Sequence, residues 1–163
     1  MADQAFDLIA NRHCRVLLLG SFPGAQSLRD RQYYANPRNH FWQLLSPLVG
    51  IDLVPLDYQN RLQTLLAHNI GLWDVVANAS RAGSLDTALR NIAPRDLNAV
   101  AANLPDLRAM AFNGATAFKI GESQLAPNPP FDRVPLPSSS PAYTIGLAAK
   151  AARWQKLGEY LKP

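Results

Sequence analysis

Short apolar runs alternate with amphipathic stretches along this chain, and that alternation constrains its fold more than any other feature. Residues 15–19, 70–76, 108–112 and 133–136 have the length and apolar character of buried strands. Apolar residues at helical spacing mark 40–49, 58–68, 94–103 and 144–161, with shorter helices expected around 6–9 and from Ala115 on. Strands alternating with helices form a parallel sheet covered on both faces. The sequence predicts an α/β protein, a three-layer α/β/α sandwich with a central, mainly parallel four-stranded sheet.

The composition is that of a globular chain. The 163 residues are 48% hydrophobic and 17% charged, which excludes intrinsic disorder and suits one domain over 1–163. No apolar run has the roughly 18 residues that a membrane span requires, and the start shows no signal-peptide pattern, so we expect a soluble cytoplasmic protein without a membrane partner.

Cysteine and histidine placement argues against bound metal. Cys14 is the only cysteine, which excludes disulfides, cysteine-rich zinc sites and cysteine-ligated clusters within the chain. His13, His40 and His68 have no metal-binding spacing. We therefore expect neither a metal nor a cofactor.

The net charge of +4 is concentrated at both ends of the chain. Residues 12–42 hold five arginines against Asp30 alone, and residues 138–163 hold four basic residues against Glu159 alone. Such charge permits a polyanionic partner, and ordinary solvated faces are the equally weighted alternative.

Polar or small residues follow each predicted strand. They are Gly20-Ser21, Asp74, Asn113-Gly114 and the segment 137–140. Ligand sites of parallel sheets lie at the carboxyl ends of the strands. These four segments are therefore expected to converge on one crevice.

Two loops have alternative interpretations. Residues 20–24, Gly-Ser-Phe-Pro-Gly, match neither a dinucleotide fingerprint nor a P-loop, so they form either a plain turn or a backbone that approaches an anion or water. Residues 137–141, Pro-Ser-Ser-Ser-Pro, lack a Gly-x-Ser-x-Gly elbow. Hydrogen bonding to phosphate is favoured there over a serine nucleophile, with a proline-bounded turn as the alternative.

The remaining candidates are amides and aromatic residues. Asn113 either caps the helix that follows or aims its amide into the crevice. Residues 33–42 interleave aromatic, amide and basic side chains in an expected loop that runs from Gly20 to about Asn39. Phe41 and Trp42 are expected in the core, whereas Tyr33 and Tyr34 are free to stack on a nucleic-acid base.

Together these segments resemble the uracil-DNA glycosylase superfamily, and most closely its hypoxanthine-DNA (DNA-deoxyinosine) glycosylase branch. Residues 17–24 are similar to the superfamily's first motif, and residues 34–42 to a segment of the mismatch-specific uracil-DNA glycosylases. Residues 137–140 resemble the second motif, closely the Pro-Ser-Ser-Ser of thymine-DNA glycosylases, and residues 71–76 resemble a strand of those enzymes. The resemblance covers nearly the whole chain in the expected order.

The resemblance implies roles for individual residues. Phe22 stands where most of the superfamily carries an Asp or Asn that positions water, and the hypoxanthine branch uses the amide that matches Asn39. Tyr34 matches the aromatic that stacks on the flipped base, and Asn113 the base-reading Asn, with Ser21 and Phe22 beside the base. The implied DNA contacts are Gly20, Pro23, Gly24, Arg38, Pro137, Ser138, Ser139, Ser140, Lys150 and Arg153, and Pro141, Ala142 or Tyr143 would fill the gap left by the base.

The implied activity is removal of deaminated bases from DNA, hypoxanthine first and uracil or xanthine second, by base flipping and attack of water. No lysine lies in the matched motifs, so hydrolysis without lyase activity is expected. We also expect a monomer. Two alternatives remain: a protein that recognises damaged or mismatched DNA without chemistry, and a hydrolase of free nucleosides in the same crevice.

Overall fold

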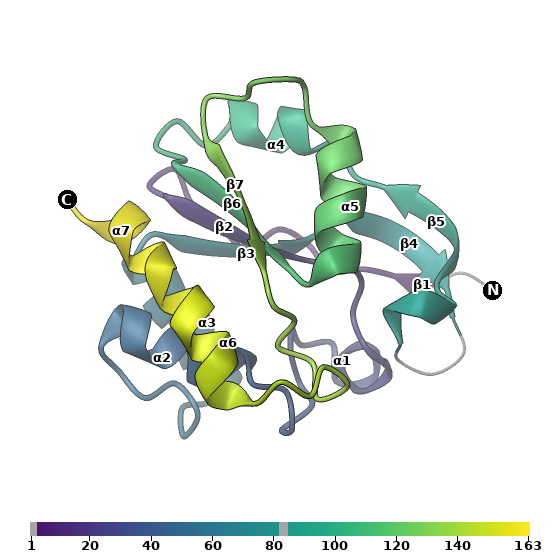
Figure 1. Ribbon diagram of the computed structural model, residues 1–163, viewed down its shortest axis with the longest axis horizontal. Helices are drawn as coiled ribbons and strands as arrows, with labels where there is room; N and C mark the ends of the chain where they lie inside the picture. Colours follow the sequence, from purple (N-terminus) through teal and green to yellow (C-terminus); the bar gives the residue numbers. More distant parts are fainter. Residues whose placement is uncertain (1–2, 82–84) are drawn as a thin grey trace.

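The computed structural model describes residues 3–81 and 85–163. They form a four-stranded parallel sheet with helices packed on both faces (Figure 1). The strand order is β3-β2-β6-β7, and every neighbouring pair is parallel. Strand β2 is Val16–Gly20, β3 is Ile70–Asp74, β6 is Ala109–Asn113 and β7 is Asp132–Leu136. The predicted fold class is confirmed.

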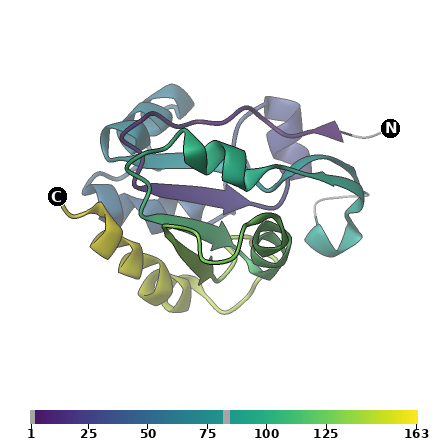
Figure 2. The same cartoon turned by 90° about the horizontal axis from the view of Figure 1, so that it is seen from above.

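Alternating side chains of the central strands fill two apolar layers. Val16 and Leu18 pack with residues of α2 (Phe41–Val49), α3 (Tyr58–Ala67) and α6 (Leu147–Trp154). Leu17 and Leu19 pack with residues of α4 (Leu97–Ala102) and α5 (Ala115–Gln124) on the opposite face. Figures 1 and 2 show these two groups of helices on either side of the sheet. Because both faces are covered, the central strands are continuous apolar runs.

A second, antiparallel sheet was not predicted. It has the order β1-β4-β5, with β1 at Asp3–Gln4, β4 at Val76–Ser80 and β5 at Arg90–Pro94, and the short helix η1 (Asp86–Ala88) precedes β5. The strand predicted over 70–76 is therefore two strands. Val75 and Val76 are fully buried, so the apolar run continues across the break and conceals it.

Several predicted boundaries were wrong. Residues 6–9 form no helix; Ile9 bridges Leu72 in antiparallel fashion, so the segment runs along β3. The helix α1 (Ala25–Asp30) lies inside the predicted loop. The helix predicted from residue 94 begins at Leu97 because Pro94 belongs to β5.

The final helix is shorter than predicted and is broken. It starts at Leu147, after Gly146 with a φ of 92°, and gives way to the 3-10 turn η2 (Gln155–Leu157) and the short α7 (Gly158–Leu161). Among residues 3–81 and 85–163, no helix combines the length and apolar character needed to cross a bilayer.

The register of the sheet aligns the strand ends. Gly20 lies beside Asp74, and the pairing of Leu19 with Phe112 sets Asn113 level with Gly20. The end of β7, Leu136, lies beside Asn113. Three polar or small residues thus occupy one edge of the sheet in adjacent strands.

Candidate functional site

A cavity of about 580 Å³ opens at this edge of the sheet. Its walls come from residues 20–27, from Arg29, Tyr33, Tyr34, Asn36 and Asn39, from Asp74, from 113–116 and from 138–143, with Leu85 and Asp86 at one side. The predicted convergence of the strand-end segments is confirmed. The volume lies in the range of cavities that enclose a small organic ligand or a base.

Asn113 ties the end of β6 to the loop after β7. Its Oδ1 accepts a hydrogen bond of 2.8 Å from the Ser139 backbone N–H, and its Nδ2 donates to Ser139 Oγ at 2.8 Å. Nδ2 also donates to Tyr34 Oη at 3.3 Å. The Asn113 side chain is 7% exposed, and both of its amide hydrogens are used. In this conformation Asn113 fixes the cavity wall.

The segment Pro137–Tyr143, which we call the serine loop, is held by short-range hydrogen bonds. Ser138 Oγ accepts from the Ser140 N–H, and Ser140 Oγ accepts from the Ala142 N–H, each at 3.1 Å. Ser139 O accepts from the His40 N–H at 3.0 Å, which joins the loop to the start of α2. Ser138 and Ser140 are half-buried at the cavity, whereas Ser139 is fully buried.

Lys150 lies behind the serine loop. The side chain is fully buried, and its Nζ donates to Ser140 O at 3.0 Å and to His40 Nδ1 at 3.2 Å. Because an ammonium only donates, His40 Nδ1 is the unprotonated nitrogen of that ring. Burial lowers the pKa of Lys150. Burial and the Lys150 charge lower the pKa of His40. Both groups brace the loop from inside the fold.

Tyr33 and Tyr34 have different environments. Tyr33 is 3% exposed, packs edge-on against Phe6 and donates from its hydroxyl to Asp7 O, so the expectation that it is free to stack on a base was wrong. Tyr34 has a left-handed backbone with a φ of 53°, which is strained for a bulky residue. Its ring stacks on Phe41 at 3.6 Å between centroids and lines the cavity. As predicted, Phe41 and Trp42 are core residues.

Gly20 leaves room for two side-chain oxygens close to its backbone at the cavity floor. A Cβ at this position would lie 2.7 Å from Asp74 Oδ1 and 2.8 Å from Tyr34 Oη. Real Cβ atoms do not approach oxygens so closely, so only glycine fits beneath this pair. The strand end is therefore shaped around the carboxyl of Asp74 and the hydroxyl of Tyr34.

Asp74 is a buried acid with incomplete hydrogen bonding. The side chain is 3% exposed, and its Oδ2 has no hydrogen-bond partner among the described residues. Burial raises its pKa to about 7; the Asp86 charge adds to the rise, while the charges of Arg95 and Arg81 oppose it. Burial and the Asp74 charge also raise the pKa of Tyr34. The floor of the cavity thus favours neutral hydroxyl and carboxyl groups.

Asn39 reaches the cavity from the start of α2. Its Oδ1 accepts from the Phe41 N–H at 2.9 Å, and its own N–H donates to Asn36 O at 3.0 Å. The amide is therefore held in a fixed turn at the cavity wall. An amide held in this way accepts or donates hydrogen bonds without changing its charge.

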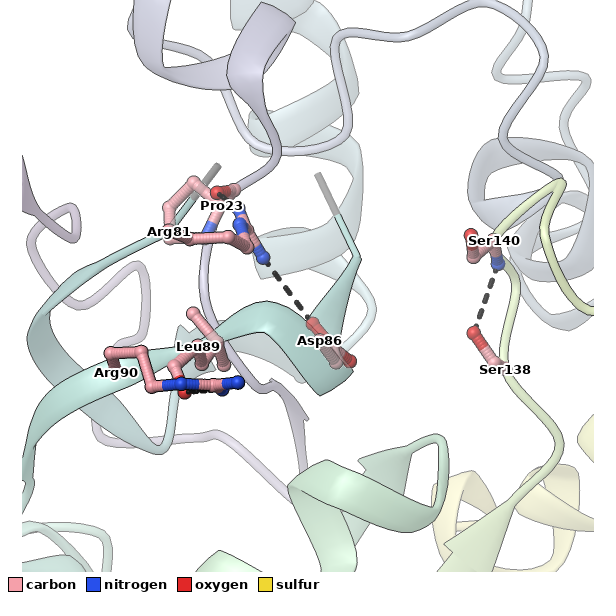
Figure 3. A network of polar contacts seen from close by, with 7 residues as sticks. All are labelled: Pro23, Arg81, Asp86, Leu89, Arg90, Ser138 and Ser140. Atoms are coloured by element: carbon pink, nitrogen blue, oxygen red, sulfur yellow. Dashed lines mark hydrogen bonds and ion pairs between the residues drawn. The ribbon is translucent and has the colours of Figure 1, made fainter. Parts of the chain in front are cut away.

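The opposite wall joins the loop after β2 to the small sheet. Arg81 donates to Pro23 O, and its guanidinium lies 5.5 Å from the centre of the Phe22 ring and 3.5 Å from Asp86 Oδ1. Figure 3 shows the Arg81–Asp86 pair across from Ser138 and Ser140. Burial raises the pKa of Asp86, whereas a hydrogen bond from Ser21 and the Arg81 charge oppose that rise.

Most of the predicted site residues line this cavity. They are Gly20, Ser21, Phe22, Pro23, Gly24, Tyr34, Asn39, Asn113, Ser138, Ser139 and Ser140. Arg38 is exposed outside the lining, and Pro137 and Lys150 lie behind it. Asp74 had been noted only as a polar strand end, and Asp86 was missed because the small sheet that carries it was not predicted.

The described residues do not form a metal-binding cluster at the cavity. Within the described part of the chain, no three His, Cys, Asp or Glu side chains are placed to hold a metal ion. The lining instead offers amides, hydroxyls, backbone groups, two acids and the guanidinium of Arg29. This donor set suits a polar organic ligand bound through hydrogen bonds.

Comparison with known proteins gives the family. The model of the Uracil DNA glycosylase superfamily matches residues 6–158. A hypoxanthine DNA glycosylase of Methanosarcina acetivorans is 34% identical over 156 residues, covering 95% of this chain and 97% of the relative. One of Methanosarcina barkeri is 39% identical over 114 residues, covering 70% and 72%.

A solved structure agrees with the sequence relatives. The solution NMR structure of a candidate uracil DNA glycosylase from Methanosarcina acetivorans superposes with a TM-score of 0.84 at 31% identity. The match covers 99% of each chain, so it includes all the loops that form the cavity. The chain belongs to the Uracil DNA glycosylase superfamily.

Proposed function

We propose that this protein is a monofunctional DNA glycosylase of one domain, acting as a monomer on deaminated bases. Hypoxanthine in deoxyinosine is the first substrate, with uracil or xanthine second. The observation that carries the proposal is the cavity at the strand ends, lined by Asn39, Tyr34 and Asn113 together. The relatives named hypoxanthine DNA glycosylase favour hypoxanthine among the deaminated bases.

The cavity would receive a base extruded from the duplex, because a stacked base is inaccessible to water and to side chains. One face of the Tyr34 ring is covered by Phe41, and the ring borders the cavity, so it offers a stacking surface for the base. Its strained backbone conformation fits a residue that is held in place for binding.

Cleavage of the N-glycosidic bond leaves positive charge on the sugar and negative charge on the departing base. Asn39 would orient the attacking water through its amide, which stays neutral throughout. No lysine is found among the described residues that line the cavity, which supports water and not an amine as the nucleophile. The product would be an abasic site in an uncut strand.

DNA contacts would come from the rim of the cavity. Ser138 and Ser140 are half-buried there, the 20–24 loop offers backbone N–H groups, and Arg38 is exposed nearby in sequence to Asn39. Since Ser139 and Lys150 are buried, we assign them to support of the serine loop. Tyr143, 45% exposed and next to Pro141 and Ala142, is proposed to fill the gap in the duplex.

The test is single-turnover cleavage of labelled duplexes that carry deoxyinosine, deoxyuridine or deoxyxanthosine. Strand breakage only after alkali, fastest with deoxyinosine, is the expected result. Breakage without alkali would contradict the monofunctional assignment. Absence of base release from all three duplexes would contradict the glycosylase assignment.

The Asn39→Ala variant tests the proposed mechanism. We expect the excision rate to fall by about 100- to 1000-fold, because one positioned polar group is lost from the transition state. The variant also loses the hydrogen bond from the Phe41 N–H at the start of α2. Asp57→Ala is the matched control, because Asp57 caps α3, accepting from the Asn60 N–H at 2.8 Å, and does not line the cavity. Equal rates for Asn39→Ala and Asp57→Ala would remove Asn39 from catalysis.

A second candidate function rests on Phe22. Its apolar ring occupies the cavity wall, 7% exposed, where a carboxylate or amide could otherwise have activated water. That feature fits a protein that recognises damaged DNA without cleaving it. Salt-dependent binding to deoxyinosine duplexes without base release would support this function in place of the first.

A further inference from the structure

Asp74 is the buried polar group of the cavity whose hydrogen bonding is incomplete. Its Oδ2 has no hydrogen-bond partner among the described residues, although Asp74 is only 3% exposed to solvent. Buried polar atoms without a partner are rare, and each requires an explanation. Because Asp74 lines the cavity, a bound ligand is positioned to supply the missing partner.

The surroundings keep Asp74 without an ion-pair partner. Two arginines face it, but Arg95 donates to Phe6 O and lies 4.1 Å from the centre of the Trp73 ring, and Arg81 donates to Pro23 O and pairs with Asp86. Neither forms a salt bridge with Asp74 among the described residues. The other titratable groups that face it are the carboxyl of Asp86 and the hydroxyls of Tyr33, Tyr34 and Tyr58.

We propose that the Asp74 carboxyl donates a hydrogen bond to the carbonyl oxygen of an oxo-base held in the cavity, and so stabilises the base as it leaves. This inference rests on the proposed glycosylase function and deepens it. Gly20 supports the assignment, since the missing side chain there leaves room for both Asp74 Oδ1 and Tyr34 Oη close to the end of β2.

The chemistry of the leaving base explains why a neutral acid is useful. As the bond to the sugar breaks, negative charge spreads over the ring and its carbonyl oxygen. A hydrogen bond to that oxygen becomes stronger in the transition state, and this difference lowers the barrier. A carboxylate would repel the same oxygen, whereas a neutral carboxyl donates to it and accepts from the neighbouring ring N–H. The proton stays on Asp74 throughout.

Protonation follows from the same geometry. Burial raises the pKa of Asp74 to about 7, so the neutral form is present in slightly acidic solution and is lost above neutrality. Asn113, in contrast, already uses both of its amide hydrogens on Ser139 and Tyr34. Asp74 Oδ2, which has no partner among the described residues, therefore keeps hydrogen-bonding capacity for a ligand at the cavity floor.

The experiment measures single-turnover excision from a deoxyinosine duplex between about pH 5.5 and about pH 8, a range that spans the titration. For the wild type we expect a plateau at low pH and a fall of about tenfold by pH 8, as the neutral form becomes the minor one. The Asp74→Asn variant keeps the donor and the shape but cannot ionise. It should retain a rate within about threefold of the plateau and lose the fall above neutrality.

Two further variants complete the test. Asp74→Ala lacks a donor, so we expect excision about 100-fold slower at every pH. Asp106→Asn, at an exposed aspartate outside the cavity, should leave both rate and pH profile unchanged. Asp74→Asn keeps the size of the side chain and its ability to donate and accept hydrogen bonds, so we expect this variant to fold like the wild type.

The outcomes separate the two levels of the proposal. A wild-type profile in Asp74→Asn, or full activity in Asp74→Ala, would overturn the role of Asp74 and leave the glycosylase function intact. Excision that rises with pH in the wild type and is lost in Asp74→Asn would show that the ionised carboxylate of Asp74 supports excision, and it would overturn the role of Asp74 as a hydrogen-bond donor. An inactive wild type would overturn the glycosylase function and this inference together.

Discussion

Asn113 and Asp74 end the two strands that flank β2, yet their environments are opposite. The side-chain amide of Asn113 forms hydrogen bonds with Ser139 and Tyr34, whereas one carboxyl oxygen of Asp74 has no partner among the described residues. Both side chains are buried, with exposures of 7% and 3%. This difference indicates that Asn113 stabilises the cavity wall, whereas Asp74 is available to bind a ligand in the cavity.

The largest effect is expected from Asn113→Ala. The substitution leaves the Ser139 N–H and Oγ buried without partners, which should lower the free energy of unfolding by about 2 to 5 kcal/mol. Excision should fall by about 100-fold, since the serine loop is no longer fixed. Urea unfolding and single-turnover excision measure the two effects.

Ser138→Ala is the matched control for that change, because it removes only the local hydrogen bond to the Ser140 N–H. A loss of stability in Asn113→Ala no greater than in this control would show that the Asn113 amide is not the main support of the loop.

Asp74→Asn should shift stability in the opposite direction. The pKa of Asp74 rises from 3.8 in the reference state to about 7 in the fold, so between these values the folded protein holds a proton that the unfolded chain has lost. Folding stability due to this group therefore falls as pH rises. Removing the charge should stabilise the protein by about 2 to 4 kcal/mol at pH 8 and hardly at all near pH 4.

Urea unfolding of both proteins across this range checks the prediction, and the difference between them cancels all other titrating groups. A constant difference at every pH would contradict the assignment of a raised pKa to Asp74.

Gly20→Ala should have a smaller effect on stability, because it disturbs both oxygens at the cavity floor without removing either. The new methyl would approach Asp74 Oδ1 and Tyr34 Oη within 3 Å, and overpacking of this kind costs about 1 to 3 kcal/mol. Gly158→Ala is the control, since its nearest neighbour would be Leu48 Cδ2 at 3.8 Å. Thermal unfolding compares the two, and equal melting temperatures would contradict the close approach at Gly20.

The main sheet was predictable because its strands are buried on both faces and appear as continuous apolar runs. The same property concealed the start of β4, since Val75 and Val76 continue the apolar run beyond the end of β3. Helix α1 has six residues, too few for apolar periodicity to reveal it. Where the end of an element depends on strand pairing or on a single glycine, the sequence alone therefore does not predict it.

The candidate site was predictable as a set of segments and less so residue by residue. Adjacent tyrosines show the limit. Both border the cavity, but Tyr33 is buried in the core at 3% exposure, whereas Tyr34 is less deeply buried, and its left-handed backbone has no glycine to signal it. Lys150 was expected to contact DNA, yet it is buried behind the serine loop and donates a hydrogen bond to Ser140 O. Such assignments depend on contacts between distant segments.

The hydrogen bonds of the serine loop have a consequence for the thermodynamics of binding. Asn113, His40 and Lys150 immobilise this segment when the chain folds, so its loss of conformational entropy is already complete before any ligand arrives. A partner that docks on the rim therefore meets a preorganised surface and keeps more of its contact energy as affinity. Heat-capacity changes on association should accordingly reflect buried surface alone, without a contribution from coupled folding of the loop.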